Sequence, residues 1–406
     1  MYRDNKELGI YIHIPFCKQK CYYCDFTSFA GCEHLQERYV ECLKKELQYR
    51  LNEVKDNYVI TTIYIGGGTP SYIDSRYIKE IMNLITSEIS RINLNNNQFE
   101  KFKLDNYQLE NIKPAYEEAT IEVNPGTVTE QKLRDYKEAG INRLSIGVQS
   151  TNNKLLKEIG RIHNYEQFIE TYNLARKIGF KNINVDLMLG LPNQTIEDLK
   201  DSLDKVMGVN PEHVSVYSLI LEEGTKLYNM VSDGKLELPD EEYERQMYWY
   251  VKNTLELNGY KHYEISNFAK TGYESKHNVN CWKQKEYIGV GLGASSYCDG
   301  VRFSNIKDLE EYIANVEAGK IDKNTIVEEM QTETDKQKEY MMLGLRMIDG
   351  VSIQEFKVKF GQNPVYLFRD ELDKLVKDKL LIVEGDKIKL TNRGLDLANQ
   401  VWMEFA

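Results

Sequence analysis

Strand-like and helix-like segments alternate through the first half of this 406-residue chain, and this alternation limits its fold more than any other feature. Short apolar, β-branched runs are separated by stretches with helical spacing. Such a pattern predicts right-handed βαβ units and a parallel sheet, hence an α/β fold. The six strands that we expect are Gly9–Ile14, Thr61–Ile65, Ala119–Val123, Arg143–Val148, Asn182–Leu187 and His213–Leu219.

Each expected strand ends at a residue that can bind a ligand. Parallel strands carry their functional side chains at their carboxyl ends, which meet at one edge of the sheet. The six residues at these ends are Cys17, Gly67, Glu122, Gln149, Asp186 and Ser218. Their regular placement predicts one shared site, and carboxylates such as Glu122 and Asp186 within apolar strands would be costly without a polar partner.

Three of the seven cysteines, Cys17, Cys21 and Cys24, follow the first strand in a C-x3-C-x2-C pattern. A disulfide needs an oxidising compartment and usually joins cysteines farther apart. A structural zinc site needs four ligands, commonly from two C-x-x-C pairs; the chain has no second pair, although His13 is a candidate fourth ligand. We favour the third alternative, a [4Fe–4S] cluster held by three thiolates with one iron open to a chelating ligand.

The phrase YIHIPFCKQKCYYCDF resembles the radical S-adenosylmethionine (SAM) enzymes. More narrowly, it resembles the oxygen-independent coproporphyrinogen III oxidases and their relatives, the HemW haem chaperones. The resemblance implies a partial (β/α)6 TIM-like barrel in which the open iron binds the amino and carboxylate groups of SAM. One electron from the cluster then cleaves SAM to a 5′-deoxyadenosyl radical.

The same resemblance assigns residues to the SAM pocket. The glycine-rich loop after the second strand would meet the methionine amino group, although a bare GGG can also be a simple turn. Arg161 can bind the SAM carboxylate with two hydrogen bonds. The full set is Tyr11, Gly67, Gly68, Thr69, Glu122, Gln149, Arg161, Asp186 and Ile220.

A second phrase, HNVNCW at 277–282, resembles the H-N-x-x-Y-W segment of these relatives, with Cys281 in place of the usual tyrosine. Neutral imidazole is a common axial donor to haem iron, so His277 is a candidate haem ligand; a structural role is the alternative. The glycine-rich segment 289–296 resembles the family's loop beside the SAM and substrate region. By itself, G-x-G-x-G is weak evidence for a nucleotide site.

We expect three units along the chain. Residues 1–225 form the radical SAM barrel with its cluster loop, 226–325 complete the barrel near the haem, and 326–406 form a winged-helix-like α+β domain. The last unit is predicted by three helices followed by a hairpin around Glu384–Asp386. Residues 90–118 are predicted to be an inserted loop without an assigned function.

Composition and charge limit the partners and the cellular location that we expect for this chain. A net charge of −11 argues against a nucleic-acid surface, and we expect the C-terminal domain to act as a lid or partner-docking module instead. No apolar run approaches the roughly 20 residues of a membrane span, and no export signal is evident. Together with the thiolate cluster, these features predict a reducing, cytoplasmic location.

Two departures separate the branches of the family. The oxidases carry a further cysteine two residues after the third, where this chain has Phe26, and an N-terminal extension, whereas the first strand here begins by about Gly9. Both favour the HemW branch. The resemblance then implies haem as cargo and acceptor haemoproteins as partners, acceptors at a membrane among them. It also implies an electron donor such as flavodoxin or ferredoxin. Radical decarboxylation of coproporphyrinogen III is the alternative.

Overall fold

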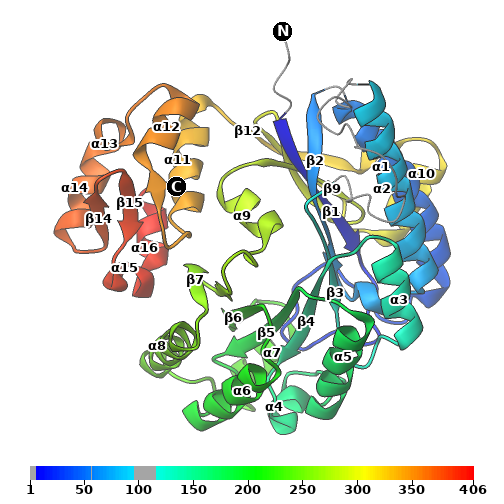
Figure 1. The fold of residues 1–406 in the computed structure, drawn as a ribbon, viewed down its shortest axis with the longest axis horizontal. Coiled ribbons are helices and arrows are strands. Elements are labelled where there is room, and N and C mark those ends of the chain that lie inside the picture. Colours follow the sequence, from blue (N-terminus) through cyan, green and yellow to red (C-terminus); the bar gives the residue numbers. More distant parts are fainter. Residues whose placement is uncertain (1–5, 56, 96–115) are drawn as a thin grey trace, which may run out of the picture.

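The computed structural model describes residues 6–55, 57–95 and 116–406. Its centre is a mixed sheet in which the six expected strands run parallel and in chain order (Figure 1). Their bounds are β1 Lys6–Ile14, β2 Tyr58–Gly67, β3 Glu118–Val123, β4 Arg143–Gln149, β5 Ile183–Leu189 and β6 His213–Ser218. The prediction of a parallel α/β barrel is confirmed.

Helices follow these strands and cover the outer side of the sheet (Figure 1). Their first turns carry strong capping signals: Thr195 and Asp198 form a reciprocal capping box, as do Asn164 and Gln167. The bounds are α1 Gln36–Val54, α2 Ser75–Asn95, α3 Glu130–Glu138, α4 Asn153–Glu158, α5 Tyr165–Ile178 and α6 Ile196–Val209.

The expected loop over residues 90–118 is wrong at both of its ends. Helix α2 continues to Asn95 because its buried positions, among them Ile78, Met82, Ile85 and Ile89, keep helical spacing. Strand β3 already begins at Glu118. The remainder of that prediction, residues 96–115, lies outside the described residues.

Further strands extend the sheet on both sides, so that the described residues form twelve strands in one sheet. On one side β9 pairs in parallel with β1, and the antiparallel strands β10, β11 and β12 follow. On the other side β8 and then β7 follow β6. The bounds are β7 Lys261–Glu264, β8 Asn267–Ala269, β9 Glu286–Val290, β10 Ser295–Cys298, β11 Val301–Asn305 and β12 Thr325–Met330.

Helices between these outer strands complete this part of the fold. Helix α9 lies between the strands and the C-terminal unit (Figure 1). The bounds are α7 Lys226–Ser232, α8 Glu241–Leu257, α9 Lys276–Trp282 and α10 Leu309–Glu317. Among the residues that the structure describes, none of the helices combines the length and apolar character needed to cross a bilayer.

The two faces of the central strands differ in chemistry. On β1, Ile10, Ile12 and Ile14 belong to the main hydrophobic core together with Leu43 of α1. The alternate positions, such as Tyr11 and His13, carry polar groups toward the inside of the barrel. Side chains of a strand point alternately to its two faces. The two-residue alternation of apolar and polar residues in β1 therefore places apolar side chains in the core and polar side chains in the interior of the barrel.

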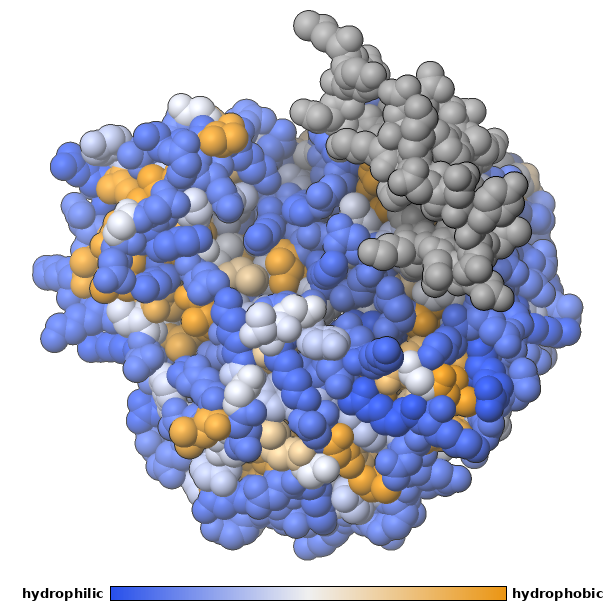
Figure 2. Space-filling view, viewed as in Figure 1, coloured by the Kyte–Doolittle hydropathy of each residue, from blue (hydrophilic) through white to orange (hydrophobic). Residues whose placement is uncertain are grey.

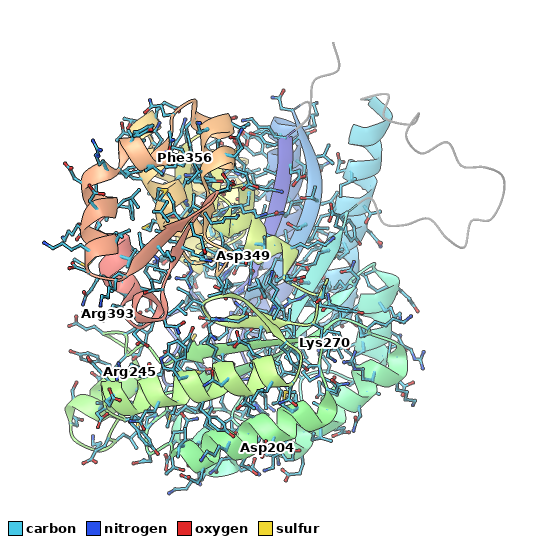
Figure 3. All side chains as sticks on the ribbon, turned by 60° about the vertical axis from the view of Figure 1, so that its left-hand side comes forward. Asp204, Arg245, Lys270, Asp349, Phe356 and Arg393 are labelled. Carbon is cyan, nitrogen blue, oxygen red and sulfur yellow. The ribbon has the colours of Figure 1, made fainter. Side chains whose placement is uncertain are left out.

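The C-terminal unit has its own small sheet, of order β13-β15-β14, and its own hydrophobic core around Phe356 (Figure 3). Four helices, rather than the predicted three, precede the predicted hairpin, and two further helices follow it. The bounds are α11 Glu333–Gly344, β13 Val351–Ser352, α12 Ile353–Phe360, α13 Pro364–Leu367, α14 Arg369–Lys377, β14 Leu381–Glu384, β15 Lys387–Leu390, α15 Asn392–Asp396 and α16 Ala398–Met403.

Polar and aromatic contacts join this unit to the barrel. The guanidinium carbon of Arg346 lies 4.3 Å from the Trp282 ring centroid of α9 and 4.9 Å from that of Trp402 of the C-terminal unit. Asp349, labelled in Figure 3, pairs with Lys261 at 3.2 Å. On the face shown in Figure 2, apolar residues lie in small groups among polar ones.

Candidate functional site

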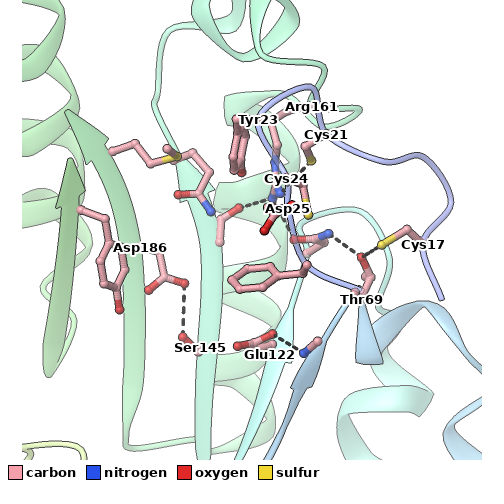
Figure 4. Close-up of a pocket in the computed structure, with 18 of the residues that line it drawn as sticks. Cys17, Cys21, Tyr23, Cys24, Asp25, Thr69, Glu122, Ser145, Arg161 and Asp186 are labelled. Carbon is pink, nitrogen blue, oxygen red and sulfur yellow. Dashed lines mark hydrogen bonds between the residues drawn. The ribbon is translucent and has the colours of Figure 1, made fainter. Parts of the chain in front are cut away.

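A cavity of about 490 Å³ lies at the carboxyl ends of the parallel strands (Figure 4). It collects residues from all six strand ends, as their regular placement predicts. Eleven predicted site residues line it: Cys17, Cys21, Cys24, Gly67, Gly68, Thr69, Glu122, Gln149, Arg161, Asp186 and Ile220.

The cysteine loop is tied back to the barrel by backbone hydrogen bonds. The Cys17 amide donates to the Phe29 carbonyl at 2.9 Å, and the Phe29 amide donates to the Pro15 carbonyl at 2.7 Å. Further along, the Tyr22 amide donates to the Ile159 carbonyl at 3.0 Å. These bonds fix a loop without regular structure, so its three thiols face one cavity.

Polar side chains approach the thiols. Thr69 Oγ1 donates to Cys17 Sγ at 3.4 Å, and Arg161 Nη1 donates to Cys21 Sγ at 3.6 Å. Burial raises the pKa of both Cys17 and Cys24, because a thiolate is poorly solvated there. Hydrogen-bond donors and a nearby cation are the surroundings that thiolate ligands need.

Two observations test whether the loop suits an iron–sulfur cluster. A Cβ added at Gly68 would lie 2.9 Å from Cys17 Sγ and 3.0 Å from the Phe16 carbonyl oxygen, so only glycine leaves this space beside the thiol. Within the described chain, no three His, Cys, Asp or Glu side chains converge closely enough to hold a single metal ion. Three separated thiols on one cavity suit a cluster, whose irons occupy different corners.

Glu122 stands at the end of β3, where its two oxygens have one partner each. Oε1 accepts from the Tyr64 hydroxyl at 3.0 Å, and Oε2 accepts from the Gly67 amide at 3.2 Å. Burial and the nearby Asp186 raise its pKa and the two donors lower it, which together give a pKa of about 7. The remaining lone pairs face the cavity and can accept from hydroxyl or ammonium groups.

Asp186, in the middle of β5, also accepts a hydrogen bond on each carboxylate oxygen. Oδ2 accepts from Ser145 Oγ at 3.2 Å, and Oδ1 accepts from Asn184 Nδ2 at 2.6 Å (Figure 4). Burial raises its pKa, and the Asn184 amide and the Arg143 charge counter that rise. The two carboxylates therefore occupy one polar wall of the cavity.

Arg161 and Gln149 also line the cavity. Arg161 Nη2 donates to Asn124 Oδ1 at 2.8 Å, whereas its buried Nε has no partner in the protein. Gln149 has φ of 66° at a register shift that ends β4, a left-handed conformation that is rare for a residue other than glycine. An unpaired guanidinium nitrogen and a constrained strand end are typical of a binding site for an anionic group.

Two predicted site residues do not line the cavity. Tyr11 lies behind its wall, with its hydroxyl 3.0 Å from His13 Nδ1. His277 is only 6% exposed, and its Nδ1 lies 3.0 Å from Thr62 Oγ1. Burial lowers the pKa of His277 to about 4, so the ring is neutral, as a haem ligand must be, but it lies beneath β2. Its role as a haem ligand stays a prediction.

Several cavity residues were missed by the sequence analysis. Tyr64, Ser145 and Tyr217 occupy inward positions of strands, where strict alternation with buried apolar neighbours was the available signal. Asn124 follows Glu122 within the E-V-N-P-G phrase.

At the cavity mouth, Phe26 and Ile220 are 68% and 69% exposed, which leaves apolar surface open to solvent.

Comparison with protein families matches two parts of the chain. Residues 11–206 match the radical SAM superfamily, and residues 331–397 match the HemN C-terminal domain. The first range holds all three cysteines and most of the cavity lining. The second falls within the small C-terminal unit.

Curated relatives extend the likeness to nearly the whole chain. The protein named Heme chaperone HemW of Bacillus subtilis is 37% identical over 97% of this chain and 98% of its own. That of Lactococcus lactis is 36% identical over 98% and 97%, and that of Escherichia coli is 32% identical over 95% of each chain.

A solved structure shares the fold. The coproporphyrinogen III oxidase HemN of Escherichia coli, described as a radical SAM enzyme, superposes with a TM-score of 0.80 at 23% identity, covering 99% of this chain and 90% of that one. At this identity the likeness concerns the fold.

Proposed function

Because this chain belongs to the HemW haem chaperone family of radical SAM proteins, we propose that it binds haem and transfers it to acceptor haemoproteins, using a [4Fe–4S] cluster and SAM. The observation that carries the proposal is the convergence of Cys17, Cys21 and Cys24 with Glu122 and Arg161 on one cavity. When bound, the cluster and SAM would supply one-electron radical chemistry.

The chain's own residues would divide the work of binding. The three cysteines would hold the cluster. Arg161, which lines the cavity, would bind a carboxylate, and Glu122 would accept from ribose hydroxyls or an ammonium group. The Gly67–Gly68 backbone would let SAM approach β2 closely.

The haem would bind as cargo. The residue that ligates its iron is not assigned. The exposed Phe26 and Ile220 at the cavity mouth support contact with a flat apolar ring. His277 would need helix α9 to move before it could reach iron, since its ring is packed beneath β2. The expected partners are haemoprotein acceptors, including membrane-bound ones, and a flavodoxin- or ferredoxin-type electron donor. The proposed location is the cytoplasm.

A paired assay separates the chaperone from an oxidase. Anaerobically reconstituted protein would be given SAM, a strong reductant and coproporphyrinogen III, and carboxyl loss would be followed by mass spectrometry. The same preparation would be loaded with haem and mixed with apomyoglobin, and transfer would be followed by its Soret spectrum. We expect haem transfer without decarboxylation. Accumulating protoporphyrinogen would instead establish the oxidase, for which the shared HemN fold is the supporting observation.

A further inference from the structure

Tyr64 of β2 occupies a central position that the proposed function does not yet use. It lines the cavity, and its hydroxyl donates to Glu122 Oε1 at 3.0 Å. The other oxygen of Glu122 accepts from the Gly67 amide at 3.2 Å. The two donors come from the same strand, so the position of β2 sets the orientation of the carboxylate.

The Tyr64 ring is held between two other rings. On one side, the Tyr11 ring of β1 stacks with it at 6.3 Å and 30°. On the other, the His277 ring of α9 lies 5.3 Å away at 33°. A Cβ added at Gly66 would lie 3.1 Å from both Tyr64 Cε1 and Glu122 Oε1, so little space is left for the pair to shift.

Helix α9 is itself anchored beneath the strands. His277 Nδ1 lies 3.0 Å from Thr62 Oγ1, and its backbone amide donates to Glu118 Oε1 at 3.1 Å. At its other end, Trp282 stacks on Arg346, which comes from beyond α11. The packing of α9 therefore reaches from the C-terminal unit to the ring that holds Glu122.

We propose that Tyr64 is a positioning residue of the SAM site: its hydroxyl orients Glu122 toward the ligand, and its ring carries the packing of α9 into the cavity wall. The inference rests on the proposed binding of SAM here. The ligand groups concerned are those that Glu122 would accept from, ribose hydroxyls or an ammonium.

The loss of the Tyr64 hydroxyl can be measured through the pKa of Glu122. The groups that face Glu122 are Tyr11 from β1, Tyr64 from β2 and Asp186 from β5. Burial and then Asp186 raise the pKa of Glu122, and the Tyr64 hydroxyl lowers it, which leaves a net pKa of about 7. Without the hydroxyl, the neutral carboxyl, which is a poorer acceptor, persists to higher pH.

The first test measures SAM affinity by equilibrium dialysis from pH 6 to 9, on cluster-loaded wild type and Tyr64→Phe. Wild-type affinity should fall as the pH falls through about 7. The variant should lose affinity at a higher pH, so its deficit should be about tenfold near neutrality and shrink toward pH 9. Tyr260→Phe is the matched control, because that buried hydroxyl donates to the Pro211 carbonyl away from the cavity. A deficit equal at every pH, or none, overturns the inference.

A second measurement needs no SAM. Infrared titration of protein labelled with ¹³C-glutamate, with Glu122→Gln subtracted to assign the band, gives the midpoint of the Glu122 carboxyl. The midpoint should rise in Tyr64→Phe and stay at the wild-type value in Tyr260→Phe. An unchanged midpoint overturns the inference even where SAM binds. Failure of the wild type to bind SAM would remove the proposed function and leave the midpoint to decide the inference.

Discussion

Two glycine-rich segments of this protein each donate a backbone amide to a glutamate, yet they differ in what that glutamate can do. In the segment 66–68, the Gly67 amide donates to Glu122 Oε2 at 3.2 Å. In the segment 289–293, the Gly291 amide donates to Glu46 Oε2 at 2.9 Å. The local pattern is the same, so the difference arises from the surroundings.

Glu46 accepts three hydrogen bonds within the protein, whereas Glu122 accepts two. Glu46 is fully buried and also accepts from Asn305 Nδ2 and the Tyr312 hydroxyl, both at 2.6 Å. Glu122 accepts one hydrogen bond on each oxygen and faces the cavity. A buried carboxylate that accepts three hydrogen bonds within the protein stabilises the fold, whereas one with more spare acceptors on a cavity is available to a ligand.

The second glycine segment does not line the cavity, although the resemblance placed its counterpart beside it. A Cβ added at Gly291 would lie 2.5 Å from the Tyr39 hydroxyl and 2.8 Å from the His13 carbonyl oxygen. One added at Gly293 would lie 2.8 Å from Thr27 Oγ1 of the cysteine loop. The segment therefore supports β1 and the cluster loop from behind.

The largest effect is expected on the cavity side of the comparison, from Cys21→Ala. Removing one of three thiolates should abolish the cluster, measured as iron and acid-labile sulfide after anaerobic reconstitution. The free energy of unfolding of the cluster-free protein should change by less than about 0.5 kcal/mol, because Cys21 is only partly buried. Cys32→Ala, outside the motif, is the control. A full four-iron complement in Cys21→Ala would contradict the assignment.

Gly291→Ala, in contrast to Cys21→Ala, should act mainly on the free energy of unfolding. Its φ of 100° and the close approach of Tyr39 and His13 predict a loss of about 3 kcal/mol in unfolding free energy, measured by urea denaturation. Gly319→Ala, also at positive φ but with open space around it, separates backbone strain from the clash. Equal losses in the two variants would show that packing behind β1 contributes nothing.

Glu46→Gln should cost about 2 kcal/mol in unfolding free energy. The amide nitrogen of glutamine cannot accept from Gly291, Asn305 or Tyr312, so at least one buried donor loses its partner. Urea denaturation at pH 8 measures the loss, and Glu53→Gln on the exposed side of α1 is the matched control. A free energy of unfolding equal to that of the wild type would mean that the three hydrogen bonds to Glu46 do not support the fold.

Much of the barrel was predictable from local patterns, and the reason is visible in β1 to β6. Their apolar alternation and polar ends arise within single segments, so each strand and its terminal residue could be identified separately. The pairing of β9 with β1 joins Glu286 to Leu8 across most of the chain, and no local signal reports it. The end of helix α2 at Asn95 was not predicted because the Asn-rich sequence there indicated a loop.

The residues of the site, like the strands of the barrel, were predictable where the signal lies within a single segment. Glu122, near the end of β3, and Asp186, within β5, were predicted because the motif and the strand assignment agreed. Tyr64 was missed because an inward tyrosine within an apolar strand looks like core. His277 shows the converse, since its motif indicates a ligand while its ring packs under β2. Sequence identifies which groups are polar, and long-range packing decides which of them face the cavity.

The smallest change in the free energy of unfolding is expected from Glu122→Gln in the absence of SAM. This substitution also gives the sharpest contrast with Glu46→Gln. The folded-state pKa of Glu122 is raised from 4.5 to about 7, so folding favours the protonated form. That contribution is complete below pH 4.5 and is lost as the pH rises through 7. Above pH 7 the ionised, under-coordinated carboxylate should destabilise the wild type relative to Glu122→Gln by about 1 kcal/mol, after allowance for solvent in the cavity.

Urea denaturation of cluster-free wild type and Glu122→Gln at pH 5 and pH 8 tests this contrast. The two proteins should match at pH 5, and the variant should be the more stable at pH 8. Glu46→Gln should be the less stable at pH 8, which reverses the sign for a substitution of identical chemistry. If both variants lose stability at pH 8, Glu122 is as fully satisfied as Glu46, and the cavity carboxylate is a structural group. A gain confined to Glu122→Gln would mean that the fold maintains, at a cost in stability, a carboxylate whose remaining acceptors are reserved for a ligand.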